Sequence, residues 1–373
     1  MFMRTMPKSL RHMPHARTVR CFALAAVCVL GTSATTAFAN DTSLTGETLL
    51  ADQARDWQVD VISDELAYPW AIRPVDGGFV MTEGEGNIVH LVDGELRRFA
   101  LQSSDPVVHE GGSGLMGLAL AGDFAQSGKA WLYYSYRSDT GARLNKLVTA
   151  EFDGQSWRET AVLLDGIPGH RLYNGGRIAF GPDGYLYVTT GWTADPALPQ
   201  DLNSLAGKIL RVTPNGAIPD DNPFPGSYIW SYGHRNPQGL AWNSDGAMYA
   251  AEHGQSGNDE LNLITAGANY GWPEVEGNDS RDGMQSPIIH AGRNTWAPSA
   301  IAMVDDVVLI AALRAKALLA YQLDATETTE VLSTNERYRD VLPLGDALYV
   351  ITTNRSPRSS GPNEGDRLLR ITP

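Results

Sequence analysis

Three polar, glycine-rich strings hold most of the residues whose types and spacing could support chemistry. They read NGGRIAFGPDGYLYVTTG (174–191), SYGHRNPQGLAW (231–242) and EHGQSGNDELNLITAGANYGWP (252–273). Each string places glycines and arginine, amide or carboxylate side chains next to an apolar, strand-like run. Loops of this composition on a β scaffold are suited to holding an anionic cofactor together with a metal ion.

The second string contains an arginine that is suited to binding a planar anion. Arg235 offers a flat fork of donors that fits a carboxylate or an ortho-quinone oxygen. A lone arginine would more often pair with an acidic neighbour, but Arg235 is clustered with His234, Asn236 and Gln238. This clustering favours contact with a ligand.

The third string indicates a site for a hard metal ion. Between Gly254 and Glu260, glycines alternate with residues that carry oxygen donors, and Asp259 and Glu260 add carboxylates. Main-chain carbonyls in such a loop are also available as ligands. Oxygen ligands at close spacing favour calcium over zinc. The alternative, a solvated acidic turn, is left open by this segment alone.

Three further arginines lie towards the C-terminus: Arg314, Arg337 and Arg339. Arg337 and Arg339 are two residues apart, so on a strand both would face the same way. Two guanidinium groups side by side repel each other unless an anion lies between them. That anion is either a neighbouring carboxylate, Glu336 or Asp340, or a ligand that carries several carboxylates.

The elements that would position these residues repeat along the chain. An apolar strand, a turn that often contains Asp-Gly and a second apolar strand recur at 71–92, 118–136, 177–191, 239–254, 301–323 and 341–353. Asp-Gly between apolar runs is a strong hairpin signal, and copies roughly 40 to 60 residues apart fit the blades of a propeller. We therefore predict an all-β fold, a six-bladed β-propeller, over a β-sandwich. The polar strings would then converge at one end of the central channel.

The N-terminus has the features of an export signal. Basic residues precede an apolar run at 21–30, and Ala37-Phe38-Ala39 fits a cleavage site before Asn40. We predict a secretory signal peptide at 1–39, a leader at 40–56 and the propeller at 57–373, in a periplasmic or secreted protein. Both cysteines lie within the signal, so the mature chain would have no disulfide and no thiolate metal site.

Charge and length disfavour several classes of partner. Without the signal the chain has 334 residues (373 − 39) and a formal charge of −19 (−14 less the five positive charges of the signal). A surface this acidic disfavours nucleic acid as a partner. No apolar run reaches the length of about 20 residues that a membrane-spanning helix needs. Dinucleotide-binding, P-loop, HExxH and GxSxG patterns do not occur either.

Several strings, in order, resemble one family: the soluble pyrroloquinoline quinone (PQQ)-dependent sugar dehydrogenases. The most specific are NGGRIAFGPDG, QDLNSLAGKILRVTPNG, SYGHRNPQG, NDELNLI with ANYGWP, and RYRDV, and the resemblance runs from about Trp70 to Thr372. It implies a six-bladed propeller that binds PQQ and Ca²⁺. It also implies oxidation of a small aldose sugar at C1 by hydride transfer to the quinone, with a histidine as the base.

The resemblance assigns roles to individual positions of this chain. Arg235 and Asn236 match residues that contact the quinone, and Arg314, Arg337 and Arg339 match basic residues that hold its carboxylates. The main-chain carbonyls of Gly254 and Gln255 match ligands of the calcium beside the quinone. Glu260 and the main chain at Tyr270 match a second calcium site.

The chain departs from the family pattern where the base is expected. The family's catalytic histidine lies four residues before the arginine of Gly-Gly-Arg, and here that position is Tyr173. A tyrosine ordinarily has a pKa near 10, so it is a poor base unless a cation such as Arg235 lowers that value. His170 is the other candidate, although three extended residues span roughly 10 Å. Gly112 and Trp192 also replace the glutamine or glutamate and the aspartate that are usual in the family.

Three functions are therefore considered. The first is a quinoprotein sugar dehydrogenase in which Tyr173 or His170 accepts the proton. The second is a quinone- or sugar-binding propeller whose catalysis is weakened or lost. The third is an interaction propeller without cofactor, which the retained arginines disfavour. The electron acceptor is an unidentified periplasmic carrier or membrane quinone, and both a monomer and a homodimer are compatible with the sequence.

Overall fold

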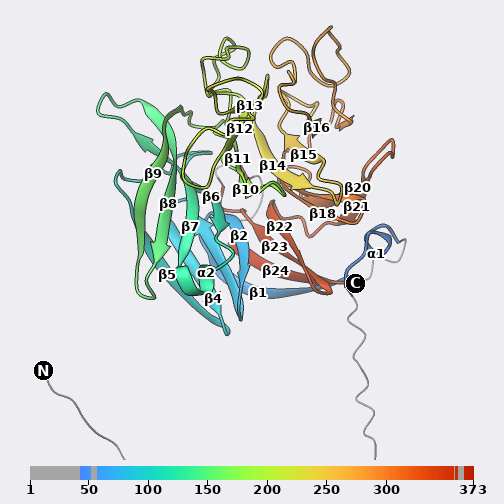
Figure 1. Ribbon diagram of the computed structural model, residues 1–373. Helices are drawn as coiled ribbons and strands as arrows, with labels where there is room; N and C mark the ends of the chain where they lie inside the picture. The colour runs from blue at the N-terminus through green and yellow to red at the C-terminus, as the bar shows by residue number, and fades with distance from the viewer. Residues whose placement is uncertain (1–42, 52–56, 357, 360–364) are drawn as a thin grey trace, which may run out of the picture. The chain divides into compact units, whose positions relative to one another are not determined.

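The computed structural model describes residues 43–51, 57–356, 358–359 and 365–373 (Figure 1). All of these residues lie within one compact unit, residues 41–373. The predicted signal peptide and residues 40–42 and 52–56 of the predicted leader lie outside the described residues. Among the described residues, no helix is long and apolar enough to cross a membrane.

Nearly all regular structure in the described residues is β-strand, arranged as six four-stranded antiparallel units. The first unit contains β2 (Pro69–Val75), β3 (Gly78–Glu83), β4 (Asn87–Val92) and β5 (Glu95–Gln102). The second contains β6 (Leu115–Leu120), β7 (Lys129–Arg137), β8 (Arg143–Phe152) and β9 (Trp157–Pro168). A short parallel pairing between β5 and β9 joins these two units into one eight-stranded sheet.

The next three units are separate sheets. The third contains β10 (Ile178–Phe180), β11 (Leu186–Thr189), β12 (Lys208–Val212) and β13 (Ile229–Tyr232). The fourth contains β14 (Pro237–Trp242), β15 (Met248–Glu252), β16 (Glu260–Ile264) and β17 (Ile289–His290). The fifth contains β18 (Pro298–Val304), β19 (Val307–Ala312), β20 (Ala317–Gln322) and β21 (Thr329–Leu332).

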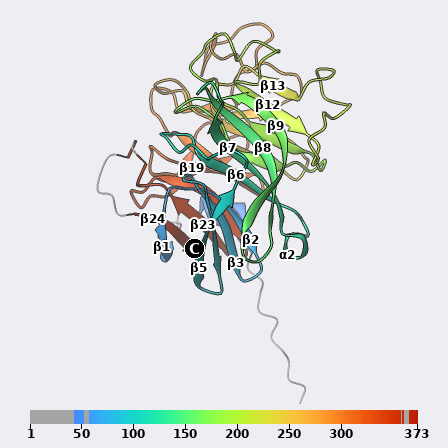
Figure 2. The ribbon, with the colours of Figure 1, turned by 90° about the vertical axis from the view of Figure 1, so that its left-hand side faces the viewer.

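The sixth unit is completed by a strand from the other end of the chain. It contains β22 (Tyr338–Leu344), β23 (Ala347–Thr352), β24 (Asp366–Thr372) and, at its edge, β1 (Gln58–Leu66). β1 pairs antiparallel with β24 from Gln58↔Thr372 to Leu66↔Asp366. The two strands lie side by side in both views (Figures 1 and 2). This pairing closes the ring with hydrogen bonds between residues near the two ends of the domain.

The first strand of each predicted repeat lies innermost. β14 contacts β18, β18 contacts β22, β22 contacts β2, β2 contacts β6, and β6 contacts β10. The guanidinium of Arg177, just before β10, donates to the main-chain oxygen of Gln238 in β14 (2.8 Å), which links the remaining neighbours. The fold is therefore the predicted six-bladed β-propeller, and the β-sandwich alternative is wrong.

The turn chemistry of the repeats explains why each one folds locally. Between β10 and β11, Asp183 accepts a hydrogen bond from the main-chain nitrogen of Tyr185, and Gly184 adopts φ +77°. Between β14 and β15, Asn243 caps the turn in the same way and Gly246 adopts φ +83°. Glycine accepts a positive φ at little cost, so these turns reverse the chain within a few residues.

Two short helices accompany the strands: α1 (Gly46–Leu50) and α2 (Phe124–Ser127). α1 lies within the predicted leader, where Thr45 caps its first turn. Leu49 is buried with Val304 and Val307 of the fifth sheet, and the main-chain nitrogen of Gly46 donates to Asp305. This described part of the leader is thus packed on the fifth blade.

Candidate active site

The polar strings meet at one end of the channel because of the direction of the strands. Each inner strand starts at this end of the channel, so the loops before β10, β14, β18 and β22 lie there. Each second strand runs back to the same end, which adds the loops after β15, β19 and β23. They enclose a pocket of about 720 Å³, called here the arginine pocket. It is lined by Tyr173, Arg235, His253, Gly254, Gln255, Ser256, Gly257, Asp259, Thr295, Ala297, Arg314, Lys316, Arg337 and Arg358.

Six of the eleven site residues predicted from sequence line this pocket: Tyr173, Arg235, Gly254, Gln255, Arg314 and Arg337. Glu260 and Tyr270 line a small neighbouring pocket that shares Arg235, His253 and Gly254 with it. His170, Asn236 and Arg339 line neither pocket. Asn236 is buried, and its side-chain oxygen accepts from the main-chain nitrogen of Gly175 (3.0 Å).

Arg235 is held in a cage of aromatic rings. Its guanidinium carbon lies 4.8 Å from the ring centre of Tyr173, 5.6 Å from that of Trp192 and 5.2 Å from that of Trp272. Its Nη1 donates to the main-chain oxygen of His253, and its buried Nε has no hydrogen-bond partner among the residues that the structure describes. Aromatic faces attract a guanidinium but do not neutralise it, so Arg235 retains its capacity for an anion.

Arg337 is the second buried cation of the pocket. Its Nη1 donates to the main-chain oxygen of Leu313 (3.2 Å), and within the described ranges its Nε has no hydrogen-bond partner. Burial lowers the pKa of Arg337 to about 10, with contributions from the charges of Arg358 and Arg314. The group therefore stays charged at neutral pH, among like charges.

Arg339 lies outside the wall of the arginine pocket. Its Nη1 donates to the side chains of Gln238 (2.9 Å) and Ser299 (3.2 Å), and its guanidinium lies over the ring of Trp70. Burial, followed by the charges of Arg337 and Arg177, lowers its pKa to about 9. β22 starts only at Tyr338 and has an irregular register up to Asp340, so the regular alternation assumed for Arg337 and Arg339 does not apply there.

Neither of the carboxylates considered as partners for these arginines reaches them. Asp340 pairs instead with Arg177 (2.9 Å) and Arg73 (3.5 Å). Glu336 accepts hydrogen bonds from Thr334 and Asn354. Within the described residues, no carboxylate lies within ion-pair distance of Arg235, Arg314, Arg337 or Arg339. The pocket therefore carries unneutralised positive charge.

The loop at 254–259 is shaped by the carboxylate of Asp259. Its Oδ1 accepts from the main-chain nitrogen of Gly254 (2.9 Å), and its Oδ2 accepts from Thr295 Oγ1 and the main-chain nitrogen of Ala297. No donor of the described residues forms a hydrogen bond to the main-chain oxygen of Gly254 or Gln255. Carbonyl oxygens of this kind are suitable ligands for calcium.

Glu260 lies beside a second buried carboxylate, that of Glu252. Asn262 Nδ2 donates to both, at 3.0 Å to Glu252 and 3.2 Å to Glu260. Burial and then the charge of Glu252 raise the pKa of Glu260 to about 8. The described residues hold no cluster of three or more acidic, histidine or cysteine side chains of metal-binding geometry. A cation here would depend on main-chain oxygens as well, such as those near Tyr270.

The two candidate bases are stacked on each other. The rings of His170 and Tyr173 are nearly parallel with centres 5.2 Å apart, but only Tyr173 lines the pocket. His170 Nδ1 accepts from the main-chain nitrogen of Leu172 (3.1 Å). Burial, followed by the charge of Arg143, lowers the pKa of His170. Its position is therefore fixed by its own loop rather than by the pocket.

The departure at Gly112 is explained by the same loop. The main-chain nitrogen of Gly112 donates to Arg171, and a Cβ at Gly112 would lie 2.5 Å from the main-chain oxygen of Leu172. A glutamine or glutamate could not stand there without moving residues 171–173. Gly112 and Tyr173 are thus two parts of one local rearrangement.

His253, which the sequence reasoning missed, also lines the arginine pocket. Its Nε2 bonds to the main-chain oxygen of Pro298 (2.8 Å), and burial lowers its pKa to about 4, so the imidazole is neutral at pH 7. The sequence feature that could have indicated His253 as a site residue is its position directly after an apolar strand, in the string Glu-His-Gly. Lys316 and Arg358 were missed as well, because nothing local distinguishes them from surface cations.

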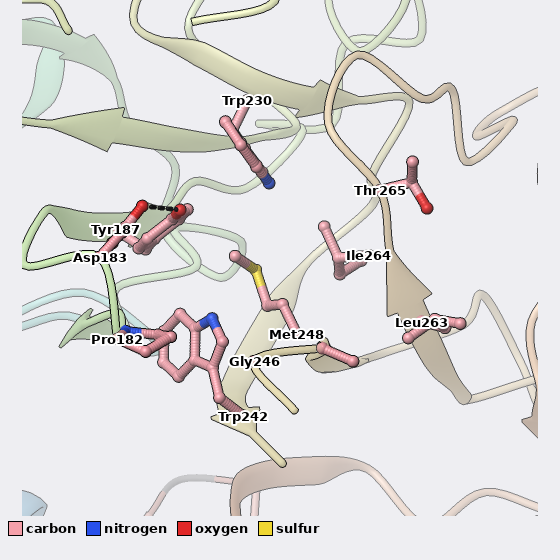
Figure 3. A pocket seen from close by; sticks show the side chains of 11 residues that line it. Pro182, Asp183, Tyr187, Trp230, Trp242, Gly246, Met248, Leu263, Ile264 and Thr265 are labelled. Carbon is pink, nitrogen blue, oxygen red and sulfur yellow. Dashed lines mark hydrogen bonds between the residues drawn. The ribbon is translucent and has the colours of Figure 1, made fainter. Parts of the chain in front are cut away.

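A different pocket, of about 420 Å³, lies at the hairpin ends of the third and fourth sheets (Figure 3). Tyr187, Trp230, Trp242 and Met248 line much of it, and Tyr187 donates a hydrogen bond to Asp183 (2.8 Å). It contains none of the predicted site residues. We therefore place the candidate active site in the arginine pocket.

The structure defines a class of protein: a six-bladed propeller with a pocket lined by arginines at one end of the channel. Comparison with known proteins identifies the family within this class. The family model described as glucose/sorbosone dehydrogenase matches residues 66–360. The chain belongs to this family. The predicted membership of an oxidoreductase family of sugar dehydrogenases is thereby confirmed.

Named relatives agree with this assignment. The aldose sugar dehydrogenase YliI of Escherichia coli (strain K12) is 32% identical, over 84% of this chain and 92% of its own length. The PQQ-bound aldose sugar dehydrogenase of Streptomyces coelicolor is 36% identical and superposes with a TM-score of 0.77, covering 85% of this chain and 98% of its own. The apo form of the soluble aldose sugar dehydrogenase of E. coli gives 31% identity and a TM-score of 0.74, covering 85% and 99%.

Proposed function

We propose that this chain is a PQQ- and calcium-dependent dehydrogenase that oxidises an aldose at C1. The observation that carries the proposal is the set of guanidinium groups in and near the arginine pocket that have no carboxylate partner among the described residues. Within the same part of the chain, Arg235, Arg337 and Arg339 each have a buried Nε without a hydrogen-bond partner. Leaving such a donor unpaired is costly, so the site is suited to a ligand with several acidic groups.

PQQ is an anionic ligand of this kind, with carboxylates and an ortho-quinone. When bound, it supplies the hydride acceptor, and calcium supplies a Lewis acid beside it. Arg314 and Arg337 would hold its carboxylates from the pocket wall. Arg235 and Asn236 would contact the quinone, and Gly254 and Gln255 would offer main-chain oxygens to the calcium. Glu260, with the main chain at Tyr270, would hold a second calcium.

The proton from the sugar hydroxyl requires an acceptor on the protein. Tyr173 is the better placed of the two candidates, because it faces the pocket and lies 4.8 Å from the guanidinium of Arg235. His170 would first have to give up the hydrogen bond that its Nδ1 accepts from Leu172.

The second candidate function is a propeller that binds the quinone or the sugar but turns over slowly. The specific observation in its favour is the replacement of the family histidine by Tyr173. Loss of a general base typically lowers the rate by a factor of about 10² to 10⁴, so slow oxidation would persist.

The experiment is reconstitution of the mature chain with PQQ and Ca²⁺, followed by the quinone absorbance. Glucose and other aldoses are then added with an artificial electron acceptor. Tight binding with sugar-dependent reduction supports the dehydrogenase, and tight binding without reduction supports the second candidate. No binding at all would refute both. Removing calcium with EDTA should abolish turnover, and adding Ca²⁺ back should restore it.

We also propose that the protein is exported, with residues 1–39 removed as a signal peptide and 57–373 forming the propeller. Electrons would then pass to a periplasmic or membrane acceptor that is still to be identified. Expression of the full chain in a Gram-negative host, with mass spectrometry of the periplasmic fraction, tests the cleavage. A mature N-terminus at Asn40 is expected, and an intact chain in the cytosol would contradict the proposal.

A further inference from the structure

The other end of the central channel holds a second pocket, of about 420 Å³, called here the channel-end pocket. All six inner strands contribute to it, through Arg73, Ala119, Ala179, Leu240, Ile301 and Leu342 among others. These residues lie further along the inner strands than the loops that form the arginine pocket. The two pockets share no lining residue.

The charged groups of this pocket do not balance. Arg73 and Arg177 both pair with the same oxygen, Oδ2 of Asp340, at 3.5 Å and 2.9 Å. That oxygen also accepts from the main-chain nitrogen of Ile72, and the other oxygen, Oδ1, accepts from the main-chain nitrogen of Val341. One carboxylate therefore serves two guanidinium groups, which leaves one positive charge.

The excess charge is buried and incompletely hydrogen-bonded. Arg177 is 3% exposed, and its buried Nη2 has no hydrogen-bond partner among the described residues. One face of its guanidinium packs on the ring of Trp70, with the carbon 4.3 Å from the ring centre. A guanidinium without its full set of acceptors is costly in such a place.

Arg73 makes the charge accessible from solvent. Its side chain is 24% exposed. Its Nη1 donates to the main-chain oxygen of Ile72 (2.6 Å), and its Nη2 has only a long contact, 3.5 Å, to the main-chain oxygen of Ile178. Its Nε has no hydrogen-bond partner in the described part of the chain, so donors remain available for a ligand that enters the pocket.

The rest of the wall is apolar and consists mainly of alanine, leucine, isoleucine, valine and phenylalanine side chains. A pocket of this volume falls in the range that small ligands occupy, and apolar walls with a few convergent polar groups are typical of such sites. The wall disfavours a sugar, whose hydroxyl groups would lose their hydrogen bonds to water there.

We propose that the channel-end pocket binds a small organic monocarboxylate. The carboxylate would take hydrogen bonds from Arg73 and neutralise the charge that Asp340 leaves uncompensated, while the apolar body of the ligand would pack against Ala179, Ile301 and Leu342. A guanidinium binds a carboxylate through two parallel hydrogen bonds, which gives the site its preference for this group. The proposal is independent of the chemistry in the arginine pocket.

The test uses the full mature chain without PQQ and 4-fluorobenzoate as the probe, with binding followed by ¹⁹F NMR and calorimetry. Carboxylates are also attracted to the arginine pocket, so matched variants are needed: Arg73→Gln for the channel end and Arg314→Gln for the arginine pocket. 4-Fluorobenzyl alcohol serves as the uncharged control. Circular dichroism checks that each variant is folded.

We expect Arg314→Gln to retain binding and Arg73→Gln to weaken it at least about tenfold, as for the loss of a charge-assisted hydrogen bond. Ala179→Leu narrows the pocket without changing its charge and should also weaken binding of 4-fluorobenzoate. If Arg73→Gln misfolds, the affinity of Ala179→Leu tests whether the probe binds in the channel-end pocket. Equal affinity in wild type, Arg73→Gln and Ala179→Leu would overturn the proposal. So would equal binding of the alcohol, because the site would then be merely apolar.

Discussion

At the scale of single residues, we propose that the chain keeps the cationic side chains of a quinone site, Arg235, Arg314 and Arg337, and changes the residue at the position of the base. Tyr173 takes that position, stacked on His170 and facing Arg235. Gly112 accommodates the loop that carries Tyr173, since a side chain there would strike Leu172. Because Gly112 contacts this loop, the role of Tyr173 is best tested by a substitution that leaves the loop and Gly112 unchanged.

Tyr173→Phe should lower aldose turnover by a factor of roughly 10² to 10⁴, the usual contribution of a general base. The affinity for PQQ should stay within about threefold of wild type, because phenylalanine keeps the ring that packs on Arg235. Steady-state kinetics and a quinone-binding titration on one preparation separate the two effects. The control is His170→Ala, which should leave turnover nearly unchanged. If His170→Ala is the inactive variant instead, the histidine is the base.

Arg314→Gln and Arg337→Gln should each weaken PQQ binding by about 10- to 100-fold, since each removes a charge-assisted hydrogen bond to a carboxylate. Arg97→Gln is the control: Arg97 pairs with Glu95 on β5, where both side chains are exposed, and its loss should not affect the affinity. The dissociation constants are measured from quinone absorbance at fixed Ca²⁺. Unchanged constants in both pocket variants would argue against the proposed cofactor.

At the scale of elements, a half-buried histidine links two neighbouring blades. In the first sheet His90, on β4, accepts a hydrogen bond from Trp157 Nε1 of β9 (2.9 Å). Its ring also lies against Phe99 and Phe152. Burial lowers the pKa of His90 to about 4. The neutral imidazole is thus the form that holds β9 to the first sheet.

The sign of the resulting pH dependence follows from this shift. Below about pH 6.5 the unfolded chain protonates His90, whereas the folded chain does so only near pH 4, so stability falls as the pH drops between these values. The variant His90→Gln keeps an acceptor for Trp157 but has no group that titrates in this range. Between pH 7 and pH 4 we expect its free energy of unfolding to fall by on the order of 1–2 kcal/mol less than that of the wild type, after a discount for the partial exposure of His90. Urea unfolding at pH 7, 6, 5 and 4 measures this difference. Parallel curves for the two proteins would contradict it.

At the scale of the whole propeller, the blades are joined by side chains distant in sequence. Arg177 stands before β10 and Asp340 on β22, 163 residues apart, and their ion pair at 2.9 Å connects opposite parts of the ring. Both side chains are almost fully buried. A buried pair contributes little net stability, but removal of one partner leaves an uncompensated charge.

Asp340→Asn should therefore lower the free energy of unfolding by about 3–5 kcal/mol. Asp346→Asn breaks the exposed pair of Asp346 with Arg370 in the same sheet and should cost less than about 1 kcal/mol. Denaturant unfolding of both variants at pH 7 gives the comparison. Equal losses would mean that the buried pair has no special role in joining the blades.

The sequence by itself determined the blades of the propeller and the family of sugar dehydrogenases to which the chain belongs. The signals are local: Asp-Gly turns between apolar runs need only a few residues to form, so they are legible without tertiary contacts. The pairing of β1 with β24, which closes the ring, has no such local signal and could not be predicted. β24 lies some 300 residues away from β1, and the alternation of buried and exposed residues along β1 is irregular.

Tertiary structure alone decided which charges meet. Glu336 and Asp340 are next to the arginines in sequence, yet Asp340 pairs with Arg177 and Arg73, and no carboxylate of the described residues forms an ion pair with Arg337 or Arg339. The tertiary structure also places three residues in the pocket wall that the sequence did not indicate: His253, Lys316 and Arg358. The electrostatic partner of a side chain depends on how the loops are placed around the ring of blades. That placement depends on all six blades packing into one closed ring, and the sequence of a single repeat does not determine it.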